Sequence, residues 1–380
     1  MTKRPTISAC LIVKDEAHNL ARCLTSIVDL VDELIVVDTG STDDTVAIAE
    51  RFGAIVFVSP WRHDFAFHRN ESFEAASGDW ILRIDADEEL VLPGGKKAFF
   101  EELAGIDPDI VMTRNIMHDI QGGRVAAVWP QYHFFRRGQV VYKNRKHNRP
   151  IFTGPCFHLK TVSTRHYGYD RSQLAGKKER DLSLLEMMHK EEPDNYEILL
   201  WKAQLYSHYE QDFKGALACL HKYIEAAADK PDFNQSAFVL GIELATAVGE
   251  EELAHALFLR AFEMDPTSVD LHFLQVREAS AARNGDAVET ACKAYLAAYE
   301  IIRTHPASLD GRLLYFTGPD ALVYVLHKAA VCHLYRGHRY LDLFHGYIDQ
   351  ASPATQKAML DAMATDLKKI QPTEKETKAA

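Results

Sequence analysis

Residues 78–87 read Gly-Asp-Trp-Ile-Leu-Arg-Ile-Asp-Ala-Asp, an apolar run that ends on two aspartates. The run predicts a buried strand at Trp80–Ile84. On an extended backbone, residues i and i+2 point the same way, so we expect Asp85 and Asp87 to address one cation or one nucleotide. Their hard oxygen ligands suit Mg²⁺ or Mn²⁺, ions that also bridge phosphates. The alternative is an acidic loop that only faces solvent.

The residues before this run alternate between strand and helix patterns. Strands are predicted at Ile7–Val13, Glu33–Asp38 and Ala54–Val58, and helices at Ala17–Leu30, after Ser41 as the cap, and at Phe67–Ser77. Alternation with short connections predicts an α/β domain with a mostly parallel sheet and helices on both faces. Ligands of such sheets bind at the carboxyl ends of the strands.

The character of the chain changes near Gln173, where Ala, Leu, Glu and Lys begin to dominate. Equivalent positions of a weak repeat, Tyr223, Ala261 and Ala298, lie 38 and 37 residues apart. This spacing is near that of the tetratricopeptide (TPR) helical hairpin. We therefore predict an α/β domain at 1–172, an all-α TPR-like repeat domain at 173–370 and a disordered tail at 371–380. An unrelated helical bundle is the alternative.

Composition narrows the classes of function. The chain has 380 residues and a formal net charge of −11, which does not favour binding to nucleic acid or anionic lipid through the overall field. No apolar run approaches the roughly 18 residues of a membrane span, and no signal-type apolar region follows the N-terminus. The six cysteines contain no CxxC pair, which argues against a zinc cluster or a disulfide framework. We expect a cytoplasmic protein without a transmembrane segment.

Three segments of the first domain occur together in the order typical of one enzyme family: Cys10–Glu16, Val36–Asp43 and Gly78–Asp87. They resemble the GT-A nucleotide-sugar domain, of Rossmann-like fold, of the inverting glycosyltransferase family 2. A narrower subset of this family carries C-terminal helical repeats and includes the peptide S-glycosyltransferases of sublancin type. The segments that resemble this subset are Trp61-x-x-Asp64-Phe65 with Arg69-Asn70, then Phe134–Arg136 and His166–Tyr169.

The resemblance implies a metal-dependent transferase that uses a nucleotide-sugar, with a UDP-sugar as the expected donor and Mn²⁺ or Mg²⁺ as the cofactor. The metal would neutralise charge on the departing nucleoside diphosphate. The ligands implied for the metal are Asp85, Asp87 and His166, and Asp87 is also counted as catalytic. The residues implied for donor binding are Val13, Glu16, Asp38, Arg69, Asp85 and Ala86. The alternatives are a surface salt bridge for Arg69 and a purely structural role for His166.

The catalytic base is where the chain departs from the family. We expect a His-Glu pair after Phe134–Arg136, but the chain has His147 followed by Asn148, and an amide is no base near neutral pH. His147 is our candidate base because its ordinary pKa near 6.5 suits the task. The alternatives are Asp119 or Glu88 as the base, an acceptor thiol that needs little help, or an inactive domain.

The acceptor is left open by the sequence. The resemblance points to a polypeptide side chain with an O- or S-linkage, recruited by the repeats. Basic residues between Arg136 and Arg149 suggest, as an alternative, a patch for an anionic glycan, a lipid-linked sugar or nucleic acid. Nucleic acid is disfavoured because no interleaved aromatic platform is evident.

Two rival functions remain. In the first, the chain is a protein-binding scaffold whose repeats bind a partner and whose catalytic domain has decayed. The repeats could also serve only as the interface of a homodimer. A nucleotidyltransferase also uses paired carboxylates and a metal. It normally has a Gly-rich loop after its first strand, where this chain has Lys14-Asp15-Glu16, so we discount it.

Overall fold

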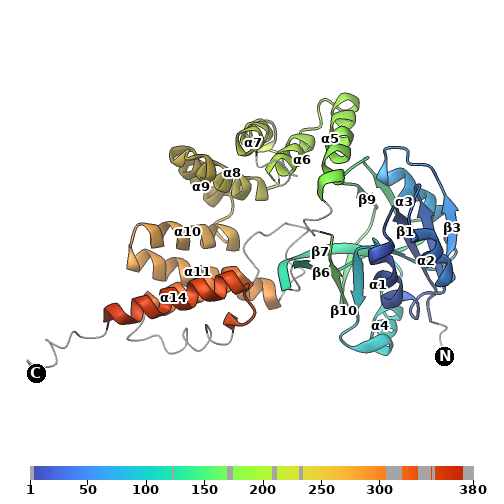
Figure 1. Cartoon of the computed structure of the whole chain (residues 1–380), viewed down its shortest axis with the longest axis horizontal. Coiled ribbons are helices and arrows are strands. Elements are labelled where there is room, and N and C mark those ends of the chain that lie inside the picture. The colour runs from blue at the N-terminus through green and yellow to red at the C-terminus, as the bar shows by residue number, and fades with distance from the viewer. Residues whose placement is uncertain are drawn as a thin grey trace, which may run out of the picture.

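The structure is a computed structural model that describes residues 4–121, 124–168, 174–207, 212–230, 234–304, 319–332, 344 and 347–370. It has an α/β part, coloured blue to teal in Figure 1, and an all-helical part, coloured green to red. The first part holds the strands and the second follows from α5 onward. The fold class predicted from the sequence is confirmed.

A mixed sheet of eight strands forms the α/β part. Its order is β3-β2-β1-β4-β7-β6-β10-β5. Neighbours from β3 to β4 and the pair β6–β10 run parallel, while β4–β7, β7–β6 and β10–β5 run antiparallel. The strands are β1 Ile7–Val13, β2 Glu33–Asp38, β3 Ile55–Val58, β4 Trp80–Arg83, β5 Glu88–Val91, β6 Met112–Gln121, β7 Arg124–Arg136 and β10 Cys156–His166.

Both faces of this sheet are covered by helices, as the alternation of apolar side chains requires. On β1, Leu11 belongs to the hydrophobic core on the side of α1, α2 and α4, whereas Cys10 belongs to the core on the side of α3. The helices are α1 Ala17–Ile27, α2 Thr45–Arg51, α3 Phe65–Glu74 and α4 Gly95–Ala104.

A small antiparallel hairpin leaves the main sheet and reaches the helical part. It consists of β8 Val141–Lys143 and β9 Arg149–Ile151. We call residues 144–149 the strap. Asn144 and His147 adopt positive φ angles of 78° and 48°, a region that non-glycine residues visit rarely. Such angles persist only where surrounding contacts hold the backbone in place.

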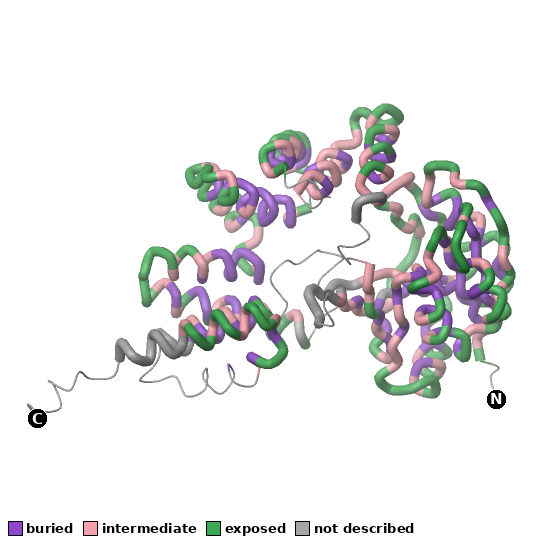
Figure 2. The backbone as a smooth tube through the Cα atoms, in the orientation of Figure 1, coloured by how far each residue is buried: buried purple, intermediate pink, exposed green. Residues whose placement is uncertain are grey.

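The helical part stacks hairpins in sequence, so that α6 packs on α7, α7 on α8, α8 on α9 and α10 on α11. Tyr223, Ala261 and Ala298 lie on α7, α9 and α11, the second helices of successive hairpins, as the repeat predicted. Buried residues, purple in Figure 2, lie where neighbouring helices face each other. The helices are α5 Leu174–Glu191, α6 Glu197–Leu205, α7 Phe213–Ala227, α8 Ser236–Val248, α9 Glu251–Met264, α10 Val269–Ala281, α11 Gly285–Thr304, α12 Pro319–Cys332 and α14 Pro353–Ile370.

Two local predictions need correction. Ser41 is not the cap of the second helix. The helix begins three residues later than that cap would place it, after Asp44, and the Ser41 hydroxyl instead accepts a hydrogen bond from the Asp15 amide at 2.9 Å. Asp85 and Asp87 do not continue an extended strand, because β4 ends at Arg83 and the chain turns at residues 86–87.

Other predictions fall where the structure gives no description. The predicted domain boundary at 172/173 lies within residues 169–173, and the tail at 371–380 also lies outside the described residues. In the part of the chain that is described, none of the helices combines the length and the apolar character needed to cross a membrane.

Gly78 provides a test of the sheet packing. A Cβ atom at this position would lie 2.7 Å from both the backbone nitrogen and the hydroxyl of Ser8, at the start of β1. We expect Gly78→Ala to lower the free energy of unfolding by about 1–3 kcal/mol, the usual cost of overpacking. Gly285→Ala is the matched control, because a Cβ there meets no atom within 4 Å. Denaturant unfolding of both variants checks this, and equal stability of the two would contradict it.

Candidate active site

The candidate site lies where three parallel strands end side by side. Val13 at the end of β1 is in register with Asp38 at the end of β2, and Cys10 of β1 is in register with Arg83 at the end of β4. The acidic residues that follow or close these strands therefore share one edge of the sheet. This is the edge at which ligands of parallel sheets bind.

Asp38 closes β2 and is 2% exposed. Its carboxylate accepts hydrogen bonds from the backbone amides of Gly40, at 3.1 Å, and Ser41, at 3.0 Å. These bonds fix the carboxylate at the carboxyl end of the strand. The backbone between them turns through Gly40, whose φ of 109° favours glycine.

Glu16 precedes α1 and lies close enough to Asp87 for their charges to interact. Burial raises the pKa of Glu16 above its usual value, and the negative charge of Asp87 adds to this rise. A hydrogen bond that the Asn19 side chain donates to Glu16, at 3.0 Å, opposes the shift. The structure thus gathers Glu16 and Asp87 from two separate motifs of the sequence.

Asp85 is clamped between two arginines. Arg69 of α3 lies with Nη2 2.9 Å from one carboxylate oxygen of Asp85 and 3.1 Å from the other. Arg83 of β4 donates from Nη1 to Asp85 at 2.7 Å. Both arginines are buried, whereas the Asp85 side chain is 31% exposed, so the arrangement fixes the carboxylate at the floor of an open site.

Behind Arg83 a chain of buried polar groups crosses the sheet, and sequence reasoning missed it. Arg83 lies 3.8 Å from Glu88, which is 2% exposed, and His133 lies 3.3 Å from the same carboxylate. The other ring nitrogen of His133 is 2.8 Å from Asn115, whose amide donates to Thr164. The signal in the sequence was an arginine inside the apolar run 80–84, because a buried arginine requires a buried partner.

Asp87 and His166 form the second half of the site. Asp87 Oδ2 lies 3.6 Å from His166 Nε2, at the end of β10. Gly168 passes so close that a Cβ there would lie 2.2 Å from Asp87 Oδ2 and 2.7 Å from His166 Nε2. The backbone therefore leaves room at this pair only because residue 168 is glycine.

This pair suits a divalent cation better than the predicted trio does. Among the described residues, no three His, Cys, Asp or Glu side chains gather closely enough to hold a metal ion. Asp85 faces its two arginines, so Asp87 and His166 are the side chains that fit the cation. One or two protein ligands suffice for Mg²⁺ when water and substrate phosphates supply the rest. The donor set therefore fits a metal that arrives with a diphosphate.

The remaining donor-site residues have core positions. Val13 is 3% exposed within the hydrophobic core, and its carbonyl accepts hydrogen bonds from the amide and hydroxyl of Thr39. Ala86 is 4% exposed in the same core. Their donor-binding roles stay predictions, and the described contacts give both residues a packing role.

The candidate bases differ in their surroundings. His147 stacks on Trp201 of α6 with ring centroids 4.9 Å apart, and desolvation together with Lys146 lowers its pKa. Burial alone would raise the pKa of Glu88, but the charges of Arg83 and His133 outweigh it and hold that pKa well below its usual range. Glu88 is thus a counter-ion and a poor base. Asp119 pairs with His166 in the strand register of β6 and β10.

The basic segment was predicted as an alternative patch for anions, and three of its residues, Arg145, Lys146 and Arg149, form ion pairs with the helical part. Arg136 donates to the backbone carbonyls of Ile110 and Asp107, and Arg137 to that of Gly78. The strap itself forms ion pairs with α5 and α6, which are Arg145–Glu191 at 2.7 Å, Lys146–Asp181 at 2.9 Å and Arg149–Glu197 at 3.2 Å.

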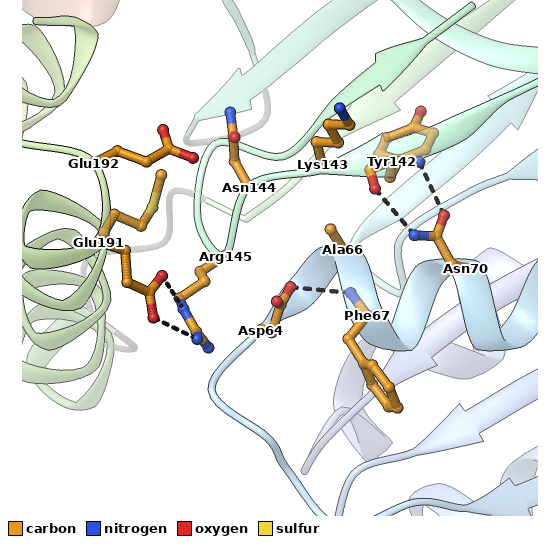
Figure 3. A pocket seen from close by; sticks show the side chains of 11 residues that line it. Asp64, Ala66, Phe67, Asn70, Tyr142, Lys143, Asn144, Arg145, Glu191 and Glu192 are labelled. Carbon is orange, nitrogen blue, oxygen red and sulfur yellow. Dashed lines mark hydrogen bonds and ion pairs between the residues drawn. The ribbon is translucent and has the colours of Figure 1, made fainter. Parts of the chain in front are cut away.

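A cavity of about 380 Å³ lies between α3, the β8–β9 hairpin and the end of α5 (Figure 3). Asp64, Asn70 and Tyr142 line it from the α/β part, and Glu191 at the end of α5 and Glu192 directly after it line it from the helical part. Asn70 exchanges two hydrogen bonds with the backbone of Tyr142, which ties α3 to the hairpin. The cavity is therefore lined by both parts of the chain, and Arg69 is not among its lining residues.

Comparison with known proteins identifies the α/β part. Residues 8–168 match the family described as glycosyl transferase family 2. The chain carries a family 2 glycosyltransferase domain. This match confirms the family 2 domain that the motifs suggested.

Two curated relatives contain the same domain. A TPR repeat-containing protein of Synechococcus elongatus is 37% identical over 207 residues, which are 50% of this chain and 49% of the relative. The SPbeta prophage-derived glycosyltransferase SunS of Bacillus subtilis is 29% identical over 202 residues, 50% of this chain and 47% of SunS. The chain therefore matches about half the length of each of these relatives.

Solved structures show a more local likeness. A structure of glucosyl-3-phosphoglycerate synthase from Mycobacterium tuberculosis, in complex with Mn²⁺, UDP and glucosyl-3-phosphoglycerate, has 32% sequence identity to this chain. The match covers 31% of this chain and 45% of the synthase chain, with a TM-score of 0.25. A score at this level carries no argument about the ligands of the family 2 domain.

Removing the charge of Glu88 tests the polar chain behind the site. Glu88→Gln removes one of the two carboxylates that face buried Arg83, the other being Asp85, and breaking a buried ion pair costs about 3–5 kcal/mol. We expect a loss of that order in the free energy of unfolding, measured by urea denaturation. Asp29→Asn is the control, because its pair with Lys96 is 73% exposed on the aspartate side and such pairs contribute about 0–1 kcal/mol. Similar losses in both variants would show that the buried pair of Glu88 contributes no more to stability than an exposed pair does.

Proposed function

We propose that the chain is an inverting, metal-dependent glycosyltransferase that moves a sugar from a UDP-sugar to the side chain of a polypeptide. The observation that carries the proposal is the juxtaposition of the clamp Arg69–Asp85–Arg83 with the pair Asp87–His166 at the carboxyl ends of the strands. A cationic clamp and a metal-type pair at one edge suit a nucleoside diphosphate. The family 2 match supports sugar transfer as the reaction.

Each group has a role in this proposal. Asp38 and Glu16 would contact the nucleoside, and Arg69 would contact the diphosphate. Asp87 and His166 would hold Mn²⁺ or Mg²⁺, which when bound neutralises charge on the leaving diphosphate. In the single displacement that inverts the anomeric carbon, the acceptor loses a proton, and an imidazole nitrogen of His147 would take it.

The polypeptide acceptor is supported by the architecture. A helical repeat array offers an extended surface suited to a peptide, and α5 and α6 are tied to the family 2 domain through the strap. The ion pairs of the strap reduce the cationic surface on which an anionic glycan, a lipid-linked sugar or nucleic acid would depend. SunS, with which this chain shares the domain, is itself named a glycosyltransferase.

A thermal-shift measurement with UDP, with and without Mn²⁺, tests the proposed function. A ligand that binds only the folded state stabilises it by about 2.7 kcal/mol at 100 times its Kd. We expect UDP with Mn²⁺ to raise the Tm by several degrees, and Asp87→Asn to lose the part of the shift that needs the metal.

The control for this measurement is Glu101→Gln, which alters a side chain that is 67% exposed on α4 and should keep the full shift. If no nucleotide shifts the Tm of the wild-type chain, the transferase proposal fails. The scaffold function would then take its place.

The pH profile tests His147 as the base. A base must be deprotonated to act, and the lowered pKa of His147 keeps it deprotonated to more acidic pH than an ordinary histidine. We therefore expect kcat/KM to fall on the acid side only below pH 6.5, which is the ordinary pKa of a histidine. His147→Gln should lower kcat by about 10²–10⁴-fold with little change in UDP affinity. A small change in kcat would assign the proton to another group or to an acceptor thiol.

A further inference from the structure

Asn148 stands where the family resemblance predicted a carboxylate, and its side chain is engaged with the donor site. Its Oδ1 atom accepts a hydrogen bond from Arg69 Nε at 2.9 Å. The same guanidinium contacts both carboxylate oxygens of Asp85 through Nη2. Asn148 and Asp85 thus share one edge of Arg69.

This shared edge fixes the plane of the guanidinium. A guanidinium is rigid and planar, so partners at Nε and at Nη2 together determine its orientation. The Tyr142 ring lies 5.8 Å from Arg69 Cζ and is itself buried, which limits movement out of that plane. Among the described residues, Arg69 Nη1 has no hydrogen-bond acceptor. The fixed orientation therefore keeps these N–H groups available to a ligand.

The charge at position 148 also matters. Arg69 and Arg83 face two carboxylates, Asp85 and Glu88, and the charge of Asp87 also acts on Arg83. A further carboxylate at position 148 would add negative charge beside Arg69, and negative charge repels a diphosphate. An amide oxygen accepts the same hydrogen bond without that charge.

The strap that carries Asn148 contacts both the α/β part and the helical part. Arg145 donates to the carbonyl of His63 at 3.1 Å, and its own carbonyl accepts from the Phe65 amide at 3.0 Å. On the other side, the three ion pairs of the strap and the stacking of His147 on Trp201 attach it to α5 and α6. The position of the amide therefore depends on the contact between the two parts of the chain.

We propose that Asn148 is a positioning residue of the donor site: it accepts from Arg69 Nε, keeps the guanidinium on Asp85 and presents Nη1 to the diphosphate. It is not a substitute for a missing base. This inference rests on the proposed function, since it assumes that a nucleoside diphosphate is the ligand. It adds to that function a role for the strap, which links the helical part to donor binding.

The test uses the full chain and measures the Kd of UDP in the presence of Mn²⁺ by calorimetry. Asn148→Leu keeps the size of the side chain and removes the acceptor, and we expect UDP to bind at least about tenfold more weakly, as for a lost hydrogen bond to a charged group. Asn148→Asp keeps the acceptor and adds a charge, and it should also weaken UDP binding while retaining the wild-type Tm.

The control is Asn234→Leu, which removes the acceptor of the Ser236 amide at the start of α8, in the helical part. It should lower the Tm without changing the Kd of UDP, which separates donor binding from general stability. If Asn148→Leu does not fold, the Kd of the aspartate variant decides.

Three results would overturn the inference. Wild-type affinity for UDP in Asn148→Leu would show that Arg69 needs no positioning by the amide. A raised kcat in Asn148→Asp, with a new acid limb in the pH profile, would show that position 148 is the place of the base. Absence of UDP binding in the wild-type chain would remove the proposed function and this inference together, whereas the first two results leave the proposed function intact.

Discussion

The ion pairs that Asp85 makes with Arg69 and Arg83 are the interactions on which the rest of the site depends. One arginine comes from α3 and the other from β4, so a single carboxylate joins a helix on one face of the sheet to the strand beneath it. Buried arginines need such a partner, because an unpaired charge in the interior is costly. Buried polar groups from Glu88 to Thr164 continue this pairing of polar partners across the sheet to β10. The last residue of β10, His166, faces Asp87.

The strap connects the helical part to the candidate site, because it contacts both α5 and Arg69. The segment Trp61-x-x-Asp64-Phe65 is explained by this contact: Asp64 caps α3, and the Phe65 ring lies 5.5 Å from Lys146 Nζ and 5.2 Å from Arg180 Cζ of α5. Trp61 packs edge-on against Phe65 at 4.7 Å. The segment from Trp61 to Phe65 is thus a place where the two parts of the chain meet.

The two aspartates of the motif have different surroundings, and the periodicity argument could not separate them. It treated residues 85–87 as extended, but a turn intervenes, in which the Asp85 amide donates to Glu88 at 2.8 Å. Asp85 consequently meets arginines, and Asp87 meets a histidine 79 residues later in the chain. Propensity and spacing describe neighbours along the chain, whereas these partners are brought together by sheet pairing.

By itself, the sequence determined the order of strands and helices, the change to helical repeats and the family, because these are written in local apolar periodicity and in short motifs. Parallel strands end together, and this places Glu16, Asp38 and Asp85 at one edge of the sheet. Only the tertiary structure decided that the basic residues of the strap face the acids of α5 and α6, and that Asn148 reaches Arg69 across 79 positions of the chain. Charge pairing at long range depends on where the fold places each side chain, and no local pattern records that.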